Sequence, residues 1–251
     1  MSELATLPTN RDEAWRYADS TAIAKLTPEA LANWHEAVLE SGETRSKDLI
    51  LGDGQAGLHR VRLMLGAGAR AEIFAVLSAS EYTRLEIEVE LGEGAHFELG
   101  GVTIGGGDAT REIVTRTLHA QPNGTSNQVI RSVHWGRATG NFLGNIDVAR
   151  DAQKTDAAQD FKGLLLEKGA TVNAVPQLEI FADDVKCAHG AAIGQMDEMA
   201  RYYMASRGID PVTARKLLVR AFIGDAFAAH GDIDAQDALM EAALNALGDM
   251  L

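Results

Sequence analysis

A ten-residue stretch at positions 85–94, Leu-Glu-Ile-Glu-Val-Glu-Leu-Gly-Glu-Gly, decides the fold class of this chain. Leu85, Ile87, Val89 and Leu91 alternate with glutamates, and this period of two is typical of a half-buried β-strand. The glycines that close the stretch are turn residues. The same alternation occupies positions 59–65, and glycine-rich turns follow near positions 106, 124 and 140. We therefore predict short strands, without a long amphipathic helix, from about residue 58 to 194.

Many short strands without intervening helices indicate a sandwich, a barrel or a β-solenoid rather than a doubly wound sheet. Strict repeats are absent, so the pattern alone does not choose among these three. At one turn, Asn123-Gly124 favours a tight hairpin. Twenty of the 25 glycines lie between Gly52 and Gly194, and the flanks on both sides are glycine-poor.

Both flanks contain residues that are typical of helix starts and helix ends. Thr27 and Pro28 form a helix start, and apolar residues at helical spacing predict that this helix continues to Gly42. In the C-terminal flank we predict helices over residues 197–207, after Asp210-Pro211, and after Asp232 or Asp234. The expected organisation is an N-terminal helical segment (1–50), a β core (51–195) and a C-terminal helical domain (196–251).

The composition excludes several classes of protein. The formal net charge is −13, which argues against nucleic-acid binding because phosphate recognition needs a concentrated basic surface. The sequence contains no run of about 18 apolar residues, which a membrane-spanning helix would need. The first 20 residues lack signal-peptide features. We expect a cytoplasmic protein that binds neither nucleic acid nor membrane.

Two glycine-rich motifs resemble nucleotide sites without the required context. Residues 52–57 match G-x-G-x-x-G, but the next residues alternate like a strand, whereas a dinucleotide site needs a helix there. The glycines at 105–107 lack the following Lys-Ser or Lys-Thr of a P-loop. We therefore predict that this chain hydrolyses no nucleotide.

The stretch Lys-Cys-Ala-His-Gly at positions 186–190 carries the strongest chemical signal. In an extended chain Cys187 and His189 project to the same side, about 6.6 Å apart along the strand, and such a pair suits a soft or borderline metal. Lys186 would favour the thiolate form of the cysteine. Because Cys187 is the only cysteine, the chain has no internal disulfide and no self-contained zinc or iron–sulfur site. If the pair binds a metal, the missing ligands must come from another chain.

Two other interpretations of this stretch stay open. A buried, apolar cysteine beside a hydrogen-bonded histidine is the commoner situation in proteins. A Cys/His hydrolase is a minor alternative, since the chain has no G-x-S-x-G motif and Cys187 lacks a recognisable nucleophile context.

The order and spacing of several segments resemble the SufD family of the SUF machinery for iron–sulfur cluster assembly. Dense similarity covers about residues 144–224 and includes positions 152–159, 176–190 and 194–198. Residues 11–19 also resemble the family's N-terminal R-x-E-x-W-R-Y-x-D segment. The resemblance implies a mostly β protein with helical flanks, built as a right-handed parallel β-helix with a C-terminal helical domain.

The resemblance also implies a role and a set of site residues. The family member is a non-catalytic scaffold subunit that pairs with its paralogue SufB and with the ATPase SufC. Lys186, Cys187 and His189 would lie at the seam with SufB, His189 as a candidate ligand of iron or of the cluster and Cys187 in support. Arg215, Phe222 and Phe227 would contribute to SufC docking; they lie on or just after the helix that follows Asp210-Pro211. No cofactor is expected on the isolated chain, and iron or a nascent cluster is expected transiently in complex with SufB.

Departures from the family pattern leave alternatives open. The Lys-Cys-Ala-His-Gly sequence without a second thiol resembles SufD rather than SufB, which has V-E-H-E at the corresponding strand and further cysteines. The chain is shorter than many members, and Ala188 stands where a serine is common. A homodimeric structural or iron-handling β-helix module is the alternative function, because exposed sheet edges pair readily.

Overall fold

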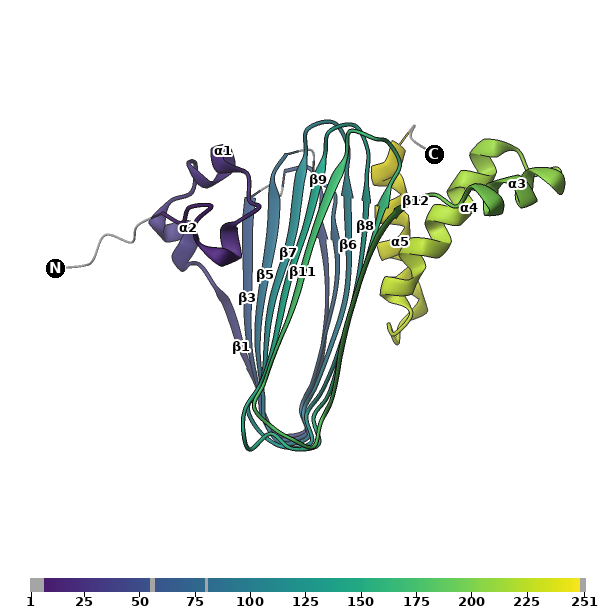
Figure 1. The fold of residues 1–251 in the computed structure, drawn as a ribbon. Helices are drawn as coiled ribbons and strands as arrows, with labels where there is room; N and C mark the ends of the chain where they lie inside the picture. Colours follow the sequence, from purple (N-terminus) through teal and green to yellow (C-terminus); the bar gives the residue numbers. More distant parts are fainter. Residues whose placement is uncertain (1–6, 55–56, 80, 249–251) are drawn as a thin grey trace.

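The computed structural model describes residues 7–54, 57–79 and 81–248, and its centre is a solenoid of parallel strands (Figure 1). The strands form two sheets of six, which we call sheet A (order β1-β3-β5-β7-β9-β11) and sheet B (order β12-β10-β8-β6-β4-β2). Their bounds are β1 His35–Leu39, β2 Thr44–Leu51, β3 Gly57–Leu65, β4 Arg70–Leu77, β5 Thr83–Leu91, β6 His96–Gly105, β7 Thr110–His119, β8 Thr125–His134, β9 Thr139–Val148, β10 Asp156–Leu165, β11 Thr171–Ile180 and β12 Lys186–Gln195.

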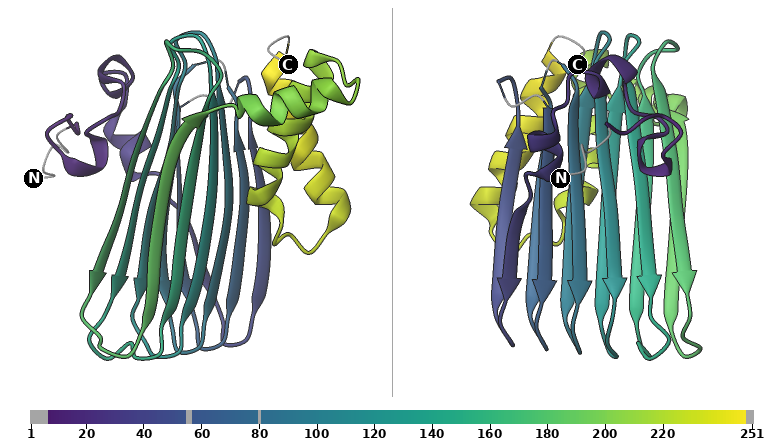
Figure 2. Two further views of the ribbon diagram at one scale, coloured as in Figure 1. Left: turned by 45° about the vertical axis from the view of Figure 1, so that its right-hand side comes forward. Right: turned by 90° about the vertical axis from the view of Figure 1, so that its left-hand side faces the viewer.

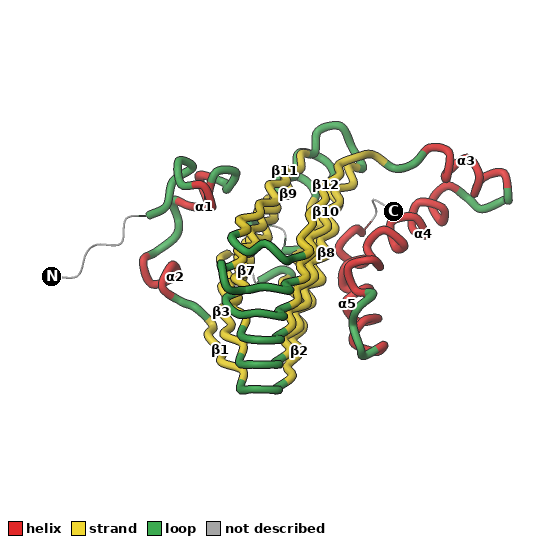
Figure 3. The backbone as a smooth tube through the Cα atoms, turned by 60° about the horizontal axis from the view of Figure 1, so that its bottom comes forward, coloured by secondary structure: helices red, strands yellow, loops and turns green. Residues whose placement is uncertain are grey.

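Successive strands alternate between the two sheets, so that each pair of strands makes one coil and each coil stacks on the previous one (Figure 3). Every pairing between coils is parallel, for example Leu85 with Ile113 and Gln128 with Gln159. The parallel β-helix with helical flanks is therefore confirmed. The predicted alternation is confirmed too, since Leu85, Ile87 and Leu91 are buried in the space between the sheets, which we call the lumen.

The lumen changes character along its axis. In the first coils it is filled by aliphatic side chains and Phe97. In the coil of β7 and β8 it holds buried polar side chains, among them His119, Gln128 and His134. The next coil, of β9 and β10, is mostly apolar apart from the buried Gln159, and its Phe142 and Phe161 rings stack 5.3 Å apart.

The turns that lead from sheet A to sheet B stack in a ladder. The backbone N–H of each turn donates to a carbonyl of the next, as in Gly68 to Glu93 and Gly94 to Pro122. Five of these six turns place one residue at positive φ, namely Gly42, Gly68, Gly94, Asn123 and Lys154, and the last turn, between β11 and β12, has none. The hairpin expected at Asn123-Gly124 is wrong, because this turn joins β7 of sheet A to β8 of sheet B instead of two paired strands.

The N-terminal helical prediction is only partly right. The elements are η1 (Glu13–Trp15), α1 (Ser20–Ile23) and α2 (Pro28–Ala32), with Thr27 accepting a hydrogen bond from Ala30 N–H as the predicted cap. The helix ends at Ala32, and β1 begins three residues later. Strands β1 and β2 lie inside the segment expected to be helical, so the solenoid begins at His35 rather than at residue 51.

The predicted starts of the C-terminal helices are confirmed. They are α3 (Glu198–Ser206), α4 (Pro211–Gly224), η2 (Asp225–Phe227) and α5 (Ile233–Leu247), and the three α-helices are capped by Asp197, Asp210 and Asp232. Helices α4 and α5 pack against the outer face of sheet B, while the N-terminal segment covers the outer face of sheet A (Figure 2). None of the helices in the described residues has the length and apolar character needed to cross a membrane.

The glycine-rich motif at residues 52–57 is followed directly by a strand. Gln55 and Ala56 of this motif lie outside the described residues, and Gly57 begins β3. The helix N-terminus that a dinucleotide site needs is therefore not there. The prediction that this motif is a turn entering a strand agrees with the structure.

Candidate functional site

The solenoid ends in two strands that have a neighbour on one side only. Strand β11 is the last strand of sheet A and β12 is the last of sheet B, so both present an open edge (Figure 3). We call this region the open end. Its lumen-facing side chains are small or apolar apart from one imidazole and one amide: Val172, Ala174, Pro176, Leu178, Ile180, Cys187, His189, Ala191, Ile193 and Gln195.

The structure places Cys187 and His189 on the same, lumen-facing side of β12, as the sequence predicted. Cys187 is in register with Ala157 and packs into the apolar cluster around it. His189 is in register with Gln159, whose side chain is buried in the lumen. Yet His189 is exposed to solvent, because no further coil covers it. The imidazole therefore lies where a second polypeptide can reach it.

The electrostatic environment of Cys187 does not favour a reactive thiolate. Burial raises the pKa of the thiol, the nearby carboxylate of Asp156 adds to the increase, and a backbone hydrogen bond with Ala157 opposes it. The prediction that Lys186 would favour the thiolate is wrong, because Lys186 lies on the opposite face of β12 and does not contribute. A cysteine nucleophile needs a lowered pKa, so this environment does not suit a hydrolase.

The ligands available in this chain do not complete a metal site. Within the described part of the chain, no three His, Cys, Asp or Glu side chains come together in a way that would hold a metal ion. His189 supplies one imidazole nitrogen, which suits iron, and Cys187 supplies a thiol that is half-buried. Within the described residues, the open end therefore offers these two potential ligands and no complete set.

Behind His189 lies a row of buried polar side chains that the sequence analysis missed. Gln128, Gln159 and His189 occupy the same rung position on β8, β10 and β12. Thr115 Oγ1 donates to Gln128 Oε1 at 2.8 Å, and Gln128 Nε2 donates to Thr117 Oγ1 at 3.0 Å. Gln159 Nε2 donates to Gln128 Oε1 at 3.4 Å. The signal in the sequence is glutamine at lumen-facing positions of two strands.

The residues predicted for SufC docking are largely unavailable. Phe227 is fully buried between the helical domain and sheet B, beside Phe74, so its assignment to a docking surface is wrong. Phe222 is half-buried, and the guanidinium of Arg131 lies 5.9 Å from its ring centre. Arg215 is half-buried and already engaged in an interaction. Phe222 and Phe227 therefore help to fix the helical domain to the solenoid.

The exposed apolar surface of the helical domain lies on α3 instead. Met199, Tyr202 and Tyr203 are 74%, 73% and 59% exposed and share one side of this helix by their spacing. We call these three residues the α3 face. Helix α3 stands away from the solenoid and contacts α4 (Figure 1).

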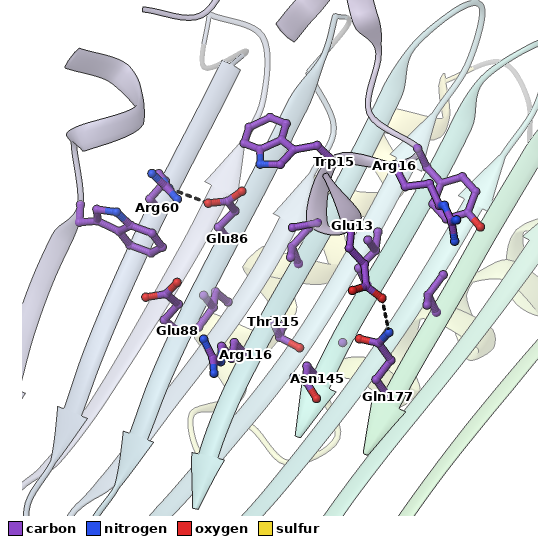
Figure 4. Close-up of a pocket in the computed structure, with 18 residues that line it drawn as sticks. Glu13, Trp15, Arg16, Arg60, Glu86, Glu88, Thr115, Arg116, Asn145 and Gln177 are labelled. Atoms are coloured by element: carbon purple, nitrogen blue, oxygen red, sulfur yellow. Dashed lines mark hydrogen bonds and ion pairs between the residues drawn. The ribbon is translucent and has the colours of Figure 1, made fainter. Parts of the chain in front are cut away.

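A groove of about 380 Å³ separates the N-terminal segment from sheet A (Figure 4). Trp15 is held there by the guanidinium of Arg84, 3.8 Å from its ring centre, and Arg84 also donates to the carbonyl of Ala14. Glu112, fully buried, pairs with Arg84 at 2.8 Å. The walls of the groove mix both charges with apolar residues, so its chemistry identifies no ligand class. The contacts explain how the N-terminal motif is anchored.

Comparisons with known proteins find one family model and several relatives that this chain matches. A family model described as SUF system FeS cluster assembly, SufBD core domain, matches residues 50–222. The iron–sulfur cluster assembly protein SufD of Escherichia coli strain K12 is 46% identical over 90 residues, which cover 36% of this chain and 21% of that protein. SufD of Bacillus subtilis strain 168 is 30% identical over 132 residues, covering 53% of this chain and 30% of that protein. A protein of Arabidopsis thaliana named ABCI7, chloroplastic, is 42% identical over 118 residues, covering 46% of this chain and 24% of that protein.

Proposed function

This chain belongs to the SufBD core-domain family of the SUF system for iron–sulfur cluster assembly, and on that premise we propose that it is a non-catalytic scaffold whose open end is completed by SufB. The observation that supports this most is the open end itself. Two parallel edge strands leave backbone N–H and C=O groups unpaired, and the adjoining lumen is lined by small and apolar side chains. A partner that adds strands here continues the lumen as one core.

His189 is the residue on which we expect the cargo to depend. A nascent cluster or iron ion is the substrate of the assembly, and a neutral imidazole is a competent ligand for it. Because His189 is the exposed, lumen-facing imidazole at this edge, SufB ligands at the seam can complete the coordination. Cys187 supports the seam by packing, in keeping with its raised pKa.

The experiment compares two histidines at opposite ends of the lumen. His189→Ala is expected to leave assembly with SufB and SufC intact while the cluster yield of the complex falls sharply. His35→Ala is the matched control, because His35 also faces the lumen on an exposed terminal strand, β1. Cluster yield measured by iron and sulfide content should be unchanged in the control. An unchanged yield in His189→Ala would refute the ligand assignment.

We place SufC docking on the α3 face. Aromatic and sulfur-containing side chains exposed at helical spacing are typical of a groove-bound helix. A double variant, Met199→Glu with Tyr202→Glu, is expected to abolish retention of SufC in a pull-down. Ile233→Glu on α5 is the control, since Ile233 is 73% exposed but lies on another helix. Retained binding in the double variant would contradict the placement.

The same open end supports the alternative, a homodimer of this chain. Light scattering of the chain alone and after mixing with SufB distinguishes the two, because a scaffold subunit should exchange a self-pair for the heteromer. A homodimer that persists in excess SufB would favour the alternative. The cytoplasmic location stays a prediction.

A further inference from the structure

We propose that Gln159 is a positioning residue for His189, through a hydrogen bond from one imidazole N–H to the buried Oε1 of the amide. This inference rests on the proposed role of His189 and adds the residue that orients it. The other ring nitrogen then carries its lone pair out of the lumen, toward the partner. The sequence alone does not indicate that Gln159 and His189 are neighbours.

The register brings the two side chains together. Gln159 on β10 and His189 on β12 are direct neighbours in a parallel pair, so both side chains stand on the same face about 4.8 Å apart at the backbone. The lumen-facing neighbours of Gln159 along β10 are Ala157 and Phe161, which offer no side-chain acceptor. Gln159 is therefore the acceptor nearest to the imidazole on this strand.

The amide of Gln159 is held in one orientation, in which its oxygen Oε1 accepts no hydrogen bond. Nε2 donates to Gln128 Oε1, and Gln128 is fixed in turn by Thr115 and Thr117. Across the lumen, Gly144 gives the amide its room, because a Cβ there would lie 2.3 Å from Nε2. Gln159 is 2% exposed, and its Oε1 is buried without any hydrogen-bond partner. Buried carbonyl oxygens of this kind are rare, because leaving one unpaired is costly.

His189 is the complementary unsatisfied group. Within the described residues it makes no hydrogen bond or ion pair, and its side chain is free to rotate because it is exposed. When a partner covers the open end, its ring N–H loses water and needs an acceptor. One rotation of the imidazole satisfies the N–H and the Gln159 oxygen together.

The chemical consequence is a fixed tautomer. Histidine ligands in proteins usually donate the second ring N–H to an acceptor, which sets the ring orientation and the nitrogen that binds the metal. A carbonyl, unlike a carboxylate, does this without adding negative charge. The row of Thr117, Gln128 and Gln159 thus supports one ligand from the two coils behind it.

The test uses the full chain labelled with ¹⁵N-histidine, bound to unlabelled SufB so that the open end is covered, and two variants of one residue. In the complex of the unmodified chain, ring nitrogen NMR shifts are expected to show one predominant tautomer of His189. Gln159→Leu has similar volume but no acceptor, and both tautomers should appear. Gln159→Glu keeps an acceptor oxygen and should restore the single tautomer. Gln177→Leu, on the outer face of β11, is the control for loss of an amide and should change nothing.

A second readout uses the complex with SufB. Cluster formation is expected to fall about tenfold in Gln159→Leu, in the range found when such supporting residues are removed, and to recover in Gln159→Glu. Equal tautomer populations in the unmodified chain and in Gln159→Leu would overturn the proposal. That result would leave the ligand role of His189 standing, because His189→Ala tests it separately.

Discussion

The two ends of the solenoid differ in what their terminal strands point into the lumen. At the first end, β2 turns Arg45 and Lys47 inward, in register with buried Ala71 and Ile73 of β4. At the open end, β12 turns Ala191 and Ile193 inward instead. Both ends expose sheet edges, but only one presents charges that an added strand would have to bury.

The difference shows how a repeated fold directs assembly to one side. Inward-pointing charged residues are a common protection of edge strands, because pairing would strip water from them. The first end is protected in this way, and β1 is short, with five residues. The open end lacks such charges, so continuation of the core there is favoured by burial of apolar surface.

The largest expected effect comes from moving the charge to the other end. Ile193→Lys places an ammonium group in the lumen-facing row of β12, where a partner would bury it unpaired. We expect the affinity for SufB to fall by at least about 100-fold, since a buried unpaired charge costs several kcal/mol. Titration calorimetry or light scattering measures it.

The control and the reciprocal variant sharpen this prediction. Ala192→Lys introduces the same charge on the outer face of β12, and binding should survive. Replacing Arg45 and Lys47 together by valine should make the first end associate with itself as concentration rises. A monomeric double variant would show that the charges do not protect this edge.

A pH effect is expected in the middle of the solenoid, toward the open end. Burial lowers the pKa of His119 to about 4 and that of His134 to about 3, from an ordinary value of 6.5. Because the unfolded chain binds these protons more tightly, both rings contribute stability above pH 6.5, and this is lost as the pH falls toward 4. Each contributes a slope of up to about 1.4 kcal/mol per pH unit. Denaturant unfolding at pH 7 and pH 5 measures the loss.

The variant His119→Gln separates this effect from general acid destabilisation. Glutamine keeps a polar group near Ser126, which contacts His119 Nε2 at 2.9 Å, but it does not titrate. The pH slope should fall by about half. Hydrogen exchange at pH 5 should show β7 and β8 losing protection before β3 and β5. If the pH dependence of the unfolding free energy were unchanged in the variant, the buried His119 ring would not be a cause of the loss of stability at acidic pH.

The smallest effect concerns the turn ladder. The first three turns have glycine at the positive-φ position, whereas the turn before β10 has Lys154 with φ 64°. A non-glycine residue pays roughly 1–2 kcal/mol there, so Lys154→Gly is expected to raise the unfolding free energy by about 1 kcal/mol. The loss of the exposed ion pair with Asp184 offsets little of this gain. Thermal unfolding measures the change, and Lys162→Gly within β10 should instead destabilise.

The sequence predicted the parts of the fold that local chemistry decides. The alternation at 85–91 and the aspartate caps of α3, α4 and α5 are confirmed, since each depends on a few neighbouring residues. The prediction of a helix as far as Gly42 was wrong. Leu31, Trp34 and Val38 fit a helical period, but Trp34 packs against another segment instead of continuing a helix. Its ring lies 3.8 Å from the Arg60 guanidinium, a contact between segments that no local pattern shows.

The site was predictable only in its local part. An extended chain puts Cys187 and His189 on one face, which the structure confirms. Whether that face is open depends on which coil is the last, and whether Phe227 is core depends on how the helical domain docks. Gln159 matters because of a neighbour 30 residues away, and its unpaired oxygen is visible only once the lumen is packed.

The regular spacing of the coils also fixes the distance between two surfaces of the solenoid. The helical domain rests on β4, β6 and β8, whereas the open edge where we propose that SufB adds strands is β12. Each added or deleted coil between them would shift that edge by about 4.8 Å without altering either surface. Under the proposed docking of SufC on α3 and of SufB at the open end, the number of coils therefore sets the distance between the two partners, and a relative with one more coil would need partners adapted to that distance.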